Sequence, residues 1–176
     1  EAGTITYGGS CSSSTTSATR RNNTITLVSL SDGTYSDCTI TVTDNSGNSV
    51  TLNMSSFVID TTAPSTSIEC PAYIGGCYVT HPINDNTPDF SFSSSEAGTV
   101  TFGGSCSSST TSVTSGTNTV TFNTLSDGIY SNCVFMVTDS AGNGSSTLVI
   151  SAFVIDTTAP TVSSTYPTDN QSGVSI

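Results

Sequence analysis

Few side chains in the sequence are of the types that carry out catalysis. His81 is the single histidine, and histidine is the residue type that ordinarily changes charge near neutral pH. It stands before Pro82 in a segment predicted to be a loop between strands. Two of the thirteen acidic residues could in principle serve glycoside hydrolysis, but the pattern brings no pair together. We therefore predict that the protein is not an enzyme and needs no cofactor.

The cysteines offer two kinds of chemistry, metal binding and disulfide formation. A metal site with cysteine ligands would be expected to show C-x-x-C spacing or several histidines. The sequence has no C-x-x-C motif, and His81 is its single histidine. Disulfides are therefore predicted, and with them an extracellular or cell-surface location, because disulfides persist in oxidising compartments. The six cysteines are Cys11, Cys38, Cys70, Cys77, Cys106 and Cys133.

Acidic extracellular repeat proteins can use calcium to stiffen the junctions between their repeats. A calcium site needs six to eight oxygen ligands, and the sequence has no Asp-x-Asp-x-Asp-Gly loop. Turn formation explains each aspartate singly, so no metal site is predicted. The weak candidates are Asp60 and Asp156 at the ends of the repeats, with Asp32, Asp44, Asp127 and Asp139 in loops.

Four Asn-x-Ser/Thr sequons could carry glycans. In a chain so rich in Asn, Ser and Thr, four is near the number expected by chance, so they are candidates only. They begin at Asn22, Asn53, Asn143 and Asn170.

The composition excludes several classes of function. Arg20 and Arg21 are the only basic residues besides His81, and the formal net charge is −11. Such a chain cannot neutralise phosphates or bind anionic lipid through charge. Apolar runs reach only a few residues, as in Leu148–Ile150, far below the roughly 20 residues of a spanning helix. Nucleic-acid binding and membrane insertion are therefore not expected.

Short alternating segments indicate an all-β fold. Thr39-Ile40-Thr41-Val42-Thr43 and Asn118-Thr119-Val120-Thr121-Phe122 alternate polar and apolar residues and are rich in β-branched side chains, which is typical of half-buried antiparallel strands. Gly and Asn in the loops 44–48 and 139–143 suit tight hairpins. In the second half we expect strands near 65–69, 88–93, 99–102, 117–123, 130–138 and 146–155.

An internal repeat organises the chain. At an offset of 95 residues, 31 of the 48 positions from Glu1 to Asn48 are identical, and Phe57–Pro64 recurs as Phe153–Pro160. We predict an incomplete module over 1–64, a complete one over 65–160, and a tail over 161–176 that resembles the opening strand of a next module. The repeat also favours one pairing among the 15 possible sets of three disulfides, namely Cys11–Cys38, Cys106–Cys133 and Cys70–Cys77.

The repeat resembles a known family. Asp32-Gly33-Thr34-Tyr35, Ile40–Asp44 running into Ser46-Gly47-Asn48, and the closing Ile59–Pro64 look like the tandem bacterial immunoglobulin-like (Big-type) repeats of surface adhesins and extracellular fibre proteins. The resemblance implies tandem immunoglobulin-like β-sandwiches, the first lacking its N-terminal strands. It also leaves open whether the modules act as spacers or as binding heads.

Two functions follow from this resemblance. The first is a structural subunit or stalk segment of an extracellular bacterial fibre. The alternative is an adhesin module that binds glycan or a cell-surface protein, for which the segment Cys70–Cys77 with Tyr73 and Tyr78 is the one candidate region.

The two ends of the chain suggest a partner. Residues 65–95 precede the Glu-Ala-Gly start of the second copy, and the first copy has no counterpart to them in this sequence. A sandwich without those strands would expose a hydrophobic slot that can accept a donated strand. We therefore expect copies of the chain to assemble head to tail, with Thr161–Ile176 of one packed on the module Glu1–Asp60 of the next. A longer polypeptide with covalently joined repeats is the alternative.

Overall fold

The structure is a computed structural model that describes residues 1–69 and 82–163. The described chain contains strands and loops but no helix, as the alternating pattern predicts. It divides into two compact units, Glu1–Thr62 (unit 1) and Ala63–Ile176 (unit 2). Cys70, Cys77, His81 and residues 164–176 lie outside the described residues.

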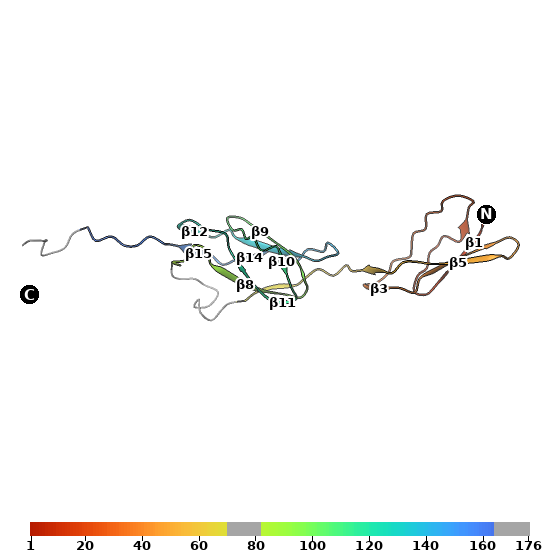
Figure 1. The fold of residues 1–176 in the computed structure, drawn as a ribbon, viewed down its shortest axis with the longest axis horizontal. Helices are drawn as coiled ribbons and strands as arrows, with labels where there is room; N and C mark the ends of the chain where they lie inside the picture. The colour runs from red at the N-terminus through yellow and green to blue at the C-terminus, as the bar shows by residue number, and fades with distance from the viewer. Residues whose placement is uncertain (70–81, 164–176) are drawn as a thin grey trace, which may run out of the picture. The chain divides into compact units, whose positions relative to one another are not determined.

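Unit 2 is a sandwich of antiparallel sheets (Figure 1). One sheet has the order β10-β9-β13-β14 and the other the order β11-β8-β7, while β12 pairs with β15. The strands are β7 (Thr66–Glu69), β8 (Asp89–Ser94), β9 (Gly98–Gly103), β10 (Ser112–Val113), β11 (Gly116–Thr121), β12 (Gly128–Tyr130), β13 (Val134–Thr138), β14 (Leu148–Val149) and β15 (Phe153–Ile155).

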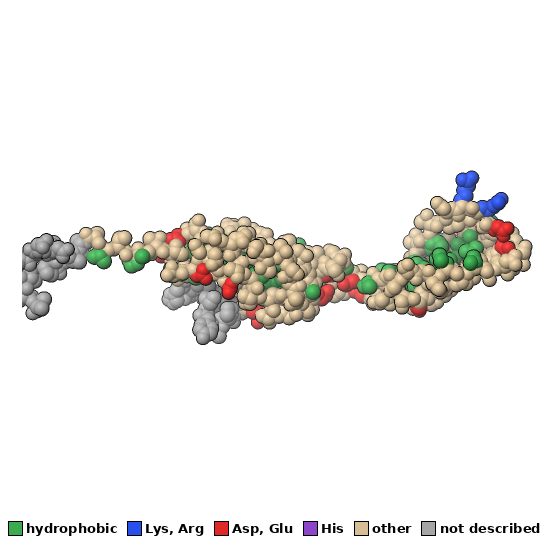
Figure 2. All heavy atoms as spheres, in the orientation of Figure 1, with side chains coloured by type: hydrophobic (Ala, Val, Ile, Leu, Met, Phe, Trp, Pro, Cys, Tyr) green, Lys and Arg blue, Asp and Glu red, His purple; other side chains and the backbone are tan. Residues whose placement is uncertain are grey.

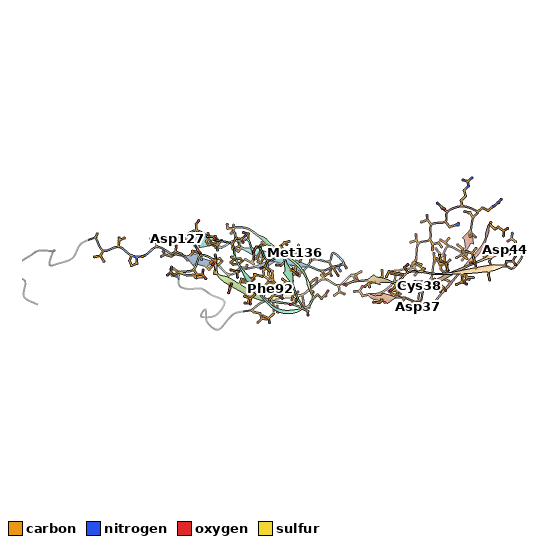
Figure 3. The ribbon with its side chains drawn as sticks, in the orientation of Figure 1. Asp37, Cys38, Asp44, Phe92, Asp127 and Met136 are labelled. Carbon is orange, nitrogen blue, oxygen red and sulfur yellow. A yellow bond between two sulfur atoms is a disulfide. The ribbon has the colours of Figure 1, made fainter. Side chains whose placement is uncertain are left out.

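The core of unit 2 lies between these sheets. Strand β8 alternates exposed or half-buried residues with the buried Phe90, Phe92 and Ser94, as a strand with one face on a core must. The Phe92 ring packs against the Phe135 ring of β13 with centroids 4.6 Å apart, and the Phe90 ring lies 5.2 Å from the same ring. Phe92 is labelled in the interior of this unit in Figure 3.

Unit 1 repeats one of these sheets closely. Its main sheet has the order β2-β1-β4-β5, which matches β10-β9-β13-β14, and β3 pairs with β6 as β12 pairs with β15. Its strands are β1 (Gly3–Gly8), β2 (Ser17–Ala18), β3 (Gly33–Tyr35), β4 (Thr39–Asp44), β5 (Ser49–Asn53) and β6 (Phe57–Ile59).

The second sheet of the sandwich has no counterpart in the described part of unit 1. Residues 21–26 stand at the positions of β11 but form no strand. In unit 2, β11 pairs with β8 over six residues, whereas no strand equivalent to β7 or β8 accompanies residues 21–26 among the strands of unit 1. A single segment without a neighbour makes no ladder of hydrogen bonds, so it stays irregular.

Two predicted strands are each divided in the structure. The expected strand 130–138 consists of the end of β12 and all of β13, and the expected strand 146–155 consists of β14 and β15. Strand β13 pairs with β9 and β14, while β12 and β15 pair with each other. The chain therefore changes sheets near residues 131–133 and again near 150–152, and each change interrupts a strand.

Candidate interaction surface

One face of the main sheet of unit 1 is apolar. The cross-strand neighbours Ile5, Val42 and Val50 form one row, and Tyr7, Ile40 and Leu52 form the next. Directly opposed residues point to the same side of a sheet, so these six side chains share a face. We call it the open face, and it consists of Ile5, Tyr7, Ile40, Val42, Val50 and Leu52.

The open face is poorly covered. Ile5 is buried, Tyr7, Ile40 and Val42 are half-buried, and Val50 and Leu52 are 69% and 66% exposed. A shallow hollow of about 300 Å³ is lined in part by Val42 and Val50. Figure 2 shows hydrophobic side chains gathered openly on the unit drawn at the right. Contiguous exposed apolar side chains of this kind mark interaction surfaces in folded proteins.

The centre of the same face is buried in unit 2. Phe135 and Val137 stand at the positions of Ile40 and Val42, and they are 1% and 0% exposed. The cover consists of β8, whose Phe90 and Phe92 pack on Phe135. The open face of unit 1 is thus the inner face of half a sandwich.

The segment that begins with β11 in unit 2 also differs in burial between the two units. Val120, Phe122 and Leu125 are buried in unit 2. Their counterparts at the offset of 95 are Ile25, Leu27 and Leu30, all half-buried. The apolar residues of unit 1 therefore keep their order in the sequence but lack the packing partners that β8 supplies in unit 2.

Comparison with known proteins identifies the second unit. Residues 79–157 match a family described as the bacterial Ig-like domain. Unit 2 contains a bacterial Ig-like domain. This agrees with its sandwich of antiparallel sheets, and the internal repeat extends the likeness to unit 1. A search of curated proteins gave no match.

Each of the two units contains one disulfide. Cys11–Cys38 and Cys106–Cys133 are bonded, with Cα atoms 5.3 Å and 5.2 Å apart, and all four side chains are buried. Cys38 is labelled in Figure 3. These are two of the three pairs expected from the repeat, and the expected Cys70–Cys77 pair falls outside the described residues.

A glycine turn places the first cysteine of each pair. Gly9 and Gly104 have φ values of 72° and 74°, and a Cβ atom on either would collide with the backbone oxygen of residue 37 or 132. Only glycine tolerates both this backbone conformation and this close approach. The turn therefore lies against the residue before Cys38 or Cys133, and Cys11 or Cys106, two residues later, bonds to that cysteine.

Asp32 in unit 1 and Asp127 in unit 2 each bind the last residues of their repeat through hydrogen bonds, and we call this arrangement the carboxylate clamp. Asp127 Oδ1 accepts hydrogen bonds from the backbone N and Oγ1 of Thr157 at 2.9 and 2.8 Å, and its Oδ2 accepts one from Thr158 Oγ1 at 2.6 Å. Asp32 accepts the same three bonds from Thr61 and Thr62. The clamp fixes the chain where it leaves each unit.

The remaining calcium candidates also take part in local hydrogen bonds. Asp60 and Asp156 each accept the backbone N–H of the threonine two residues later. Asp44 and Asp139 organise the hairpin loops, each accepting three bonds from the residues two and four positions later. These roles are those of turn-forming aspartates. Asp60 and Asp156 remain weak calcium candidates that no finding tests.

Acid should weaken the clamp. Hydrogen bonds from Thr158 and Thr157 hold the pKa of Asp127 below its ordinary value of 3.8, so the carboxylate stabilises the fold above that value and loses this contribution as the pH falls through the lower pKa of the folded state. We expect amide exchange at Thr157 to accelerate in this acidic window and Asp127→Asn to remove most of that pH dependence. Asp32→Asn, which alters only the clamp of unit 1, is the matched control. Unchanged acid dependence in Asp127→Asn would contradict the assignment.

The sequons differ in how they are presented. Asn22 and Asn53 are exposed. Asn143 is half-buried and its Nδ2, the atom that would carry a glycan, donates to Asp139 Oδ2 at 2.8 Å. Asn170 falls outside the described residues. Glycosylation stays a prediction, and the geometry favours Asn22 and Asn53 over Asn143.

No helix in the described chain combines the length and apolar character that crossing a membrane requires.

Proposed function

We propose that the protein is a structural segment, either a stalk or a subunit, of an extracellular bacterial fibre, and that its copies assemble head to tail by strand complementation. The observation that carries the proposal is the open face of unit 1. It presents Ile40 and Val42, whose counterparts Phe135 and Val137 are buried in the core of unit 2, where Phe90 and Phe92 of β8 pack on Phe135. Adding a strand from another chain is an established way for such a sheet to be completed.

The disulfide and the carboxylate clamp, which occur in both units, support a structural role. Each Ig-like unit has its own buried disulfide and its own carboxylate clamp at the exit. Disulfides also favour an oxidising, extracellular setting. The repeated aromatic residues stack on one another instead of standing fully exposed, since Tyr35 stacks on Phe57 and Tyr130 on Phe153. This favours a structural role over the alternative, an adhesin that binds glycan or a cell-surface protein through exposed aromatics.

In the proposed contact, Thr161–Ile176 of one copy lies on the module Glu1–Asp60 of the next. The two surfaces are different, so the contact is heterologous and propagates into a filament unless the rotation closes a ring.

Truncation after Pro160 should abolish this assembly. We expect the full chain to show a mass that grows with concentration in sedimentation velocity, and the truncated chain to remain monomeric at the same concentrations. Filaments formed by the truncated chain would refute strand donation. So would a native polypeptide in which many repeats are joined by peptide bonds.

A further inference from the structure

Residues 21–26 of unit 1, the segment that would pair with a donated strand, are held by the same side-chain hydrogen bonds as β11. In unit 2, Asn118 Nδ2 donates to the carbonyls of Thr114 and Gly116, and Ser108 Oγ donates to the carbonyl of Thr121. These bonds hold the two ends of β11. Unit 1 makes the same bonds with Asn23 and Ser13, whose acceptors are the carbonyls of Thr19, Arg21 and Thr26.

The backbone of this segment is fixed as well. Val28 N–H donates to the carbonyl of Ser12 at 2.8 Å, as Asn123 N–H does to that of Ser107. Residues 21–26 are therefore anchored at both ends like β11, although they form no strand. Anchoring in advance lowers the entropy cost of binding a strand.

Unit 2 defines what the incoming strand must contain. Strand β8 places Phe90 and Phe92, two residues apart, on the core, and pairs Phe90 with Val120 and Phe92 with Asn118. A strand for unit 1 thus needs two large apolar side chains at alternate positions, one opposite Ile25 and one opposite Asn23.

The end of this chain contains that pattern. Val174-Ser175-Ile176 has the same apolar-Ser-apolar order as Phe90-Ser91-Phe92, and Asp169-Asn170 precedes it at the same spacing as Asp85-Asn86. Counting from the repeated proline, 25 residues separate Pro64 from Phe90 and 13 separate Pro160 from Val174. The 12 additional residues equal the length of Cys70–His81, which includes the Cys70–Cys77 segment. Residues 161–176 therefore align with residues 65–92 when the 12 residues Cys70–His81 are left out.

We propose that Val174 and Ile176 of one copy occupy, on the open face of the next copy, the places that Phe90 and Phe92 occupy in unit 2. The strand runs antiparallel to residues 21–26, with Val174 opposite Ile25 and Ile176 opposite Asn23. This assignment rests on the proposed head-to-tail assembly and names the side chains that drive it.

The donor side is tested by the double substitution Val174→Ser and Ile176→Ser in the full chain. Each buried aliphatic side chain contributes enough on transfer from water that we expect the association constant in sedimentation velocity to fall by about a hundredfold or more. Ser175→Ala is the matched control on the opposite face of the same strand, and we expect it to assemble like the wild type.

The acceptor side is tested by Val50→Asp. Val50 is 69% exposed on the open face, so the monomer should tolerate the change while assembly weakens at least about tenfold, because a charge would be placed in an apolar contact. Thr51→Asp, on the other face of β5, is the matched control.

The outcomes separate this inference from the proposed function. If truncation after Pro160 abolishes assembly but V174S/I176S assembles normally, residues 161–176 act in another way and this inference is wrong. If Val50→Asp and Thr51→Asp have equal effects, the open face is not the acceptor. A wild-type chain that stays monomeric at every concentration overturns both proposals.

Discussion

Replacement of Cys106 and Cys133 by alanine is expected to lower the free energy of unfolding of unit 2 by about 3–4 kcal/mol. The bond closes a loop with a sequence separation of 27, and the chain-entropy estimate for a loop of this size falls in that range. Typical domains have net stabilities of roughly 5–15 kcal/mol, so this loss is a large share. Urea unfolding of the oxidised and double-alanine proteins measures the difference.

The equivalent change in unit 1 provides the control. Cys11→Ala with Cys38→Ala removes a bond with the same sequence separation and should destabilise unit 1 while the transition of unit 2 keeps its midpoint. Mass mapping of the native protein without reductant tests the premise. Free thiols at Cys38 and Cys133 would contradict both disulfides and the inference of an oxidising compartment.

The strand pattern could be predicted from the sequence because it depends on local alternation. Ile40 and Val42 alternate with threonines, and Phe90 and Phe92 alternate with serines, so each segment reveals its inner face. The pairing of Cys11 with Cys38 followed from the repeat. A repeat imposes the same fold on both copies, and therefore the same bond.

The divided strands could not be predicted in this way. Tyr130 and Val134 belong to different sheets, and hydrophobic periodicity does not report which neighbour a strand pairs with. Residues 21–26 also show that a local sequence pattern does not determine which strands form. Their sequence resembles β11 closely, yet they form no strand in unit 1, because strand formation depends on the neighbour that pairs with it.

The open face was predicted in outline but not in detail. The alternation of Ile40 and Val42 with threonines indicated one apolar face on this sheet. Val50 and Leu52 are exposed on β5, which is longer than its counterpart β14, and the length of β5 could not be read from a sequence pattern that the two copies share. The positions that a covering strand must fill follow from the structure of unit 2, in which Phe90 and Phe92 of β8 pack on Phe135.

Phe135→Ala is expected to destabilise unit 2 by about 3–5 kcal/mol, the usual cost of removing a buried phenylalanine ring. Phe135 is 1% exposed and packs against Phe90, Phe92 and Phe102. Its removal would leave a cavity bounded by two sheets, which cannot close without moving β8. The measurement is the midpoint of denaturant unfolding of unit 2, with the transition of unit 1 as the internal reference.

Ile40→Ala is the equivalent substitution in unit 1, and its cost relative to Phe135→Ala shows whether the open face is covered in the monomer. Ile40 is half-buried on the open face, so in the dilute monomer its loss should cost less than the about 2–5 kcal/mol of a fully buried isoleucine. The cost should rise with protein concentration, because a donated strand would bury this side chain as β8 buries Phe135. If Ile40→Ala were as damaging as Phe135→Ala in dilute monomer, the face would already be covered within one chain, and no second copy would be needed to complete it.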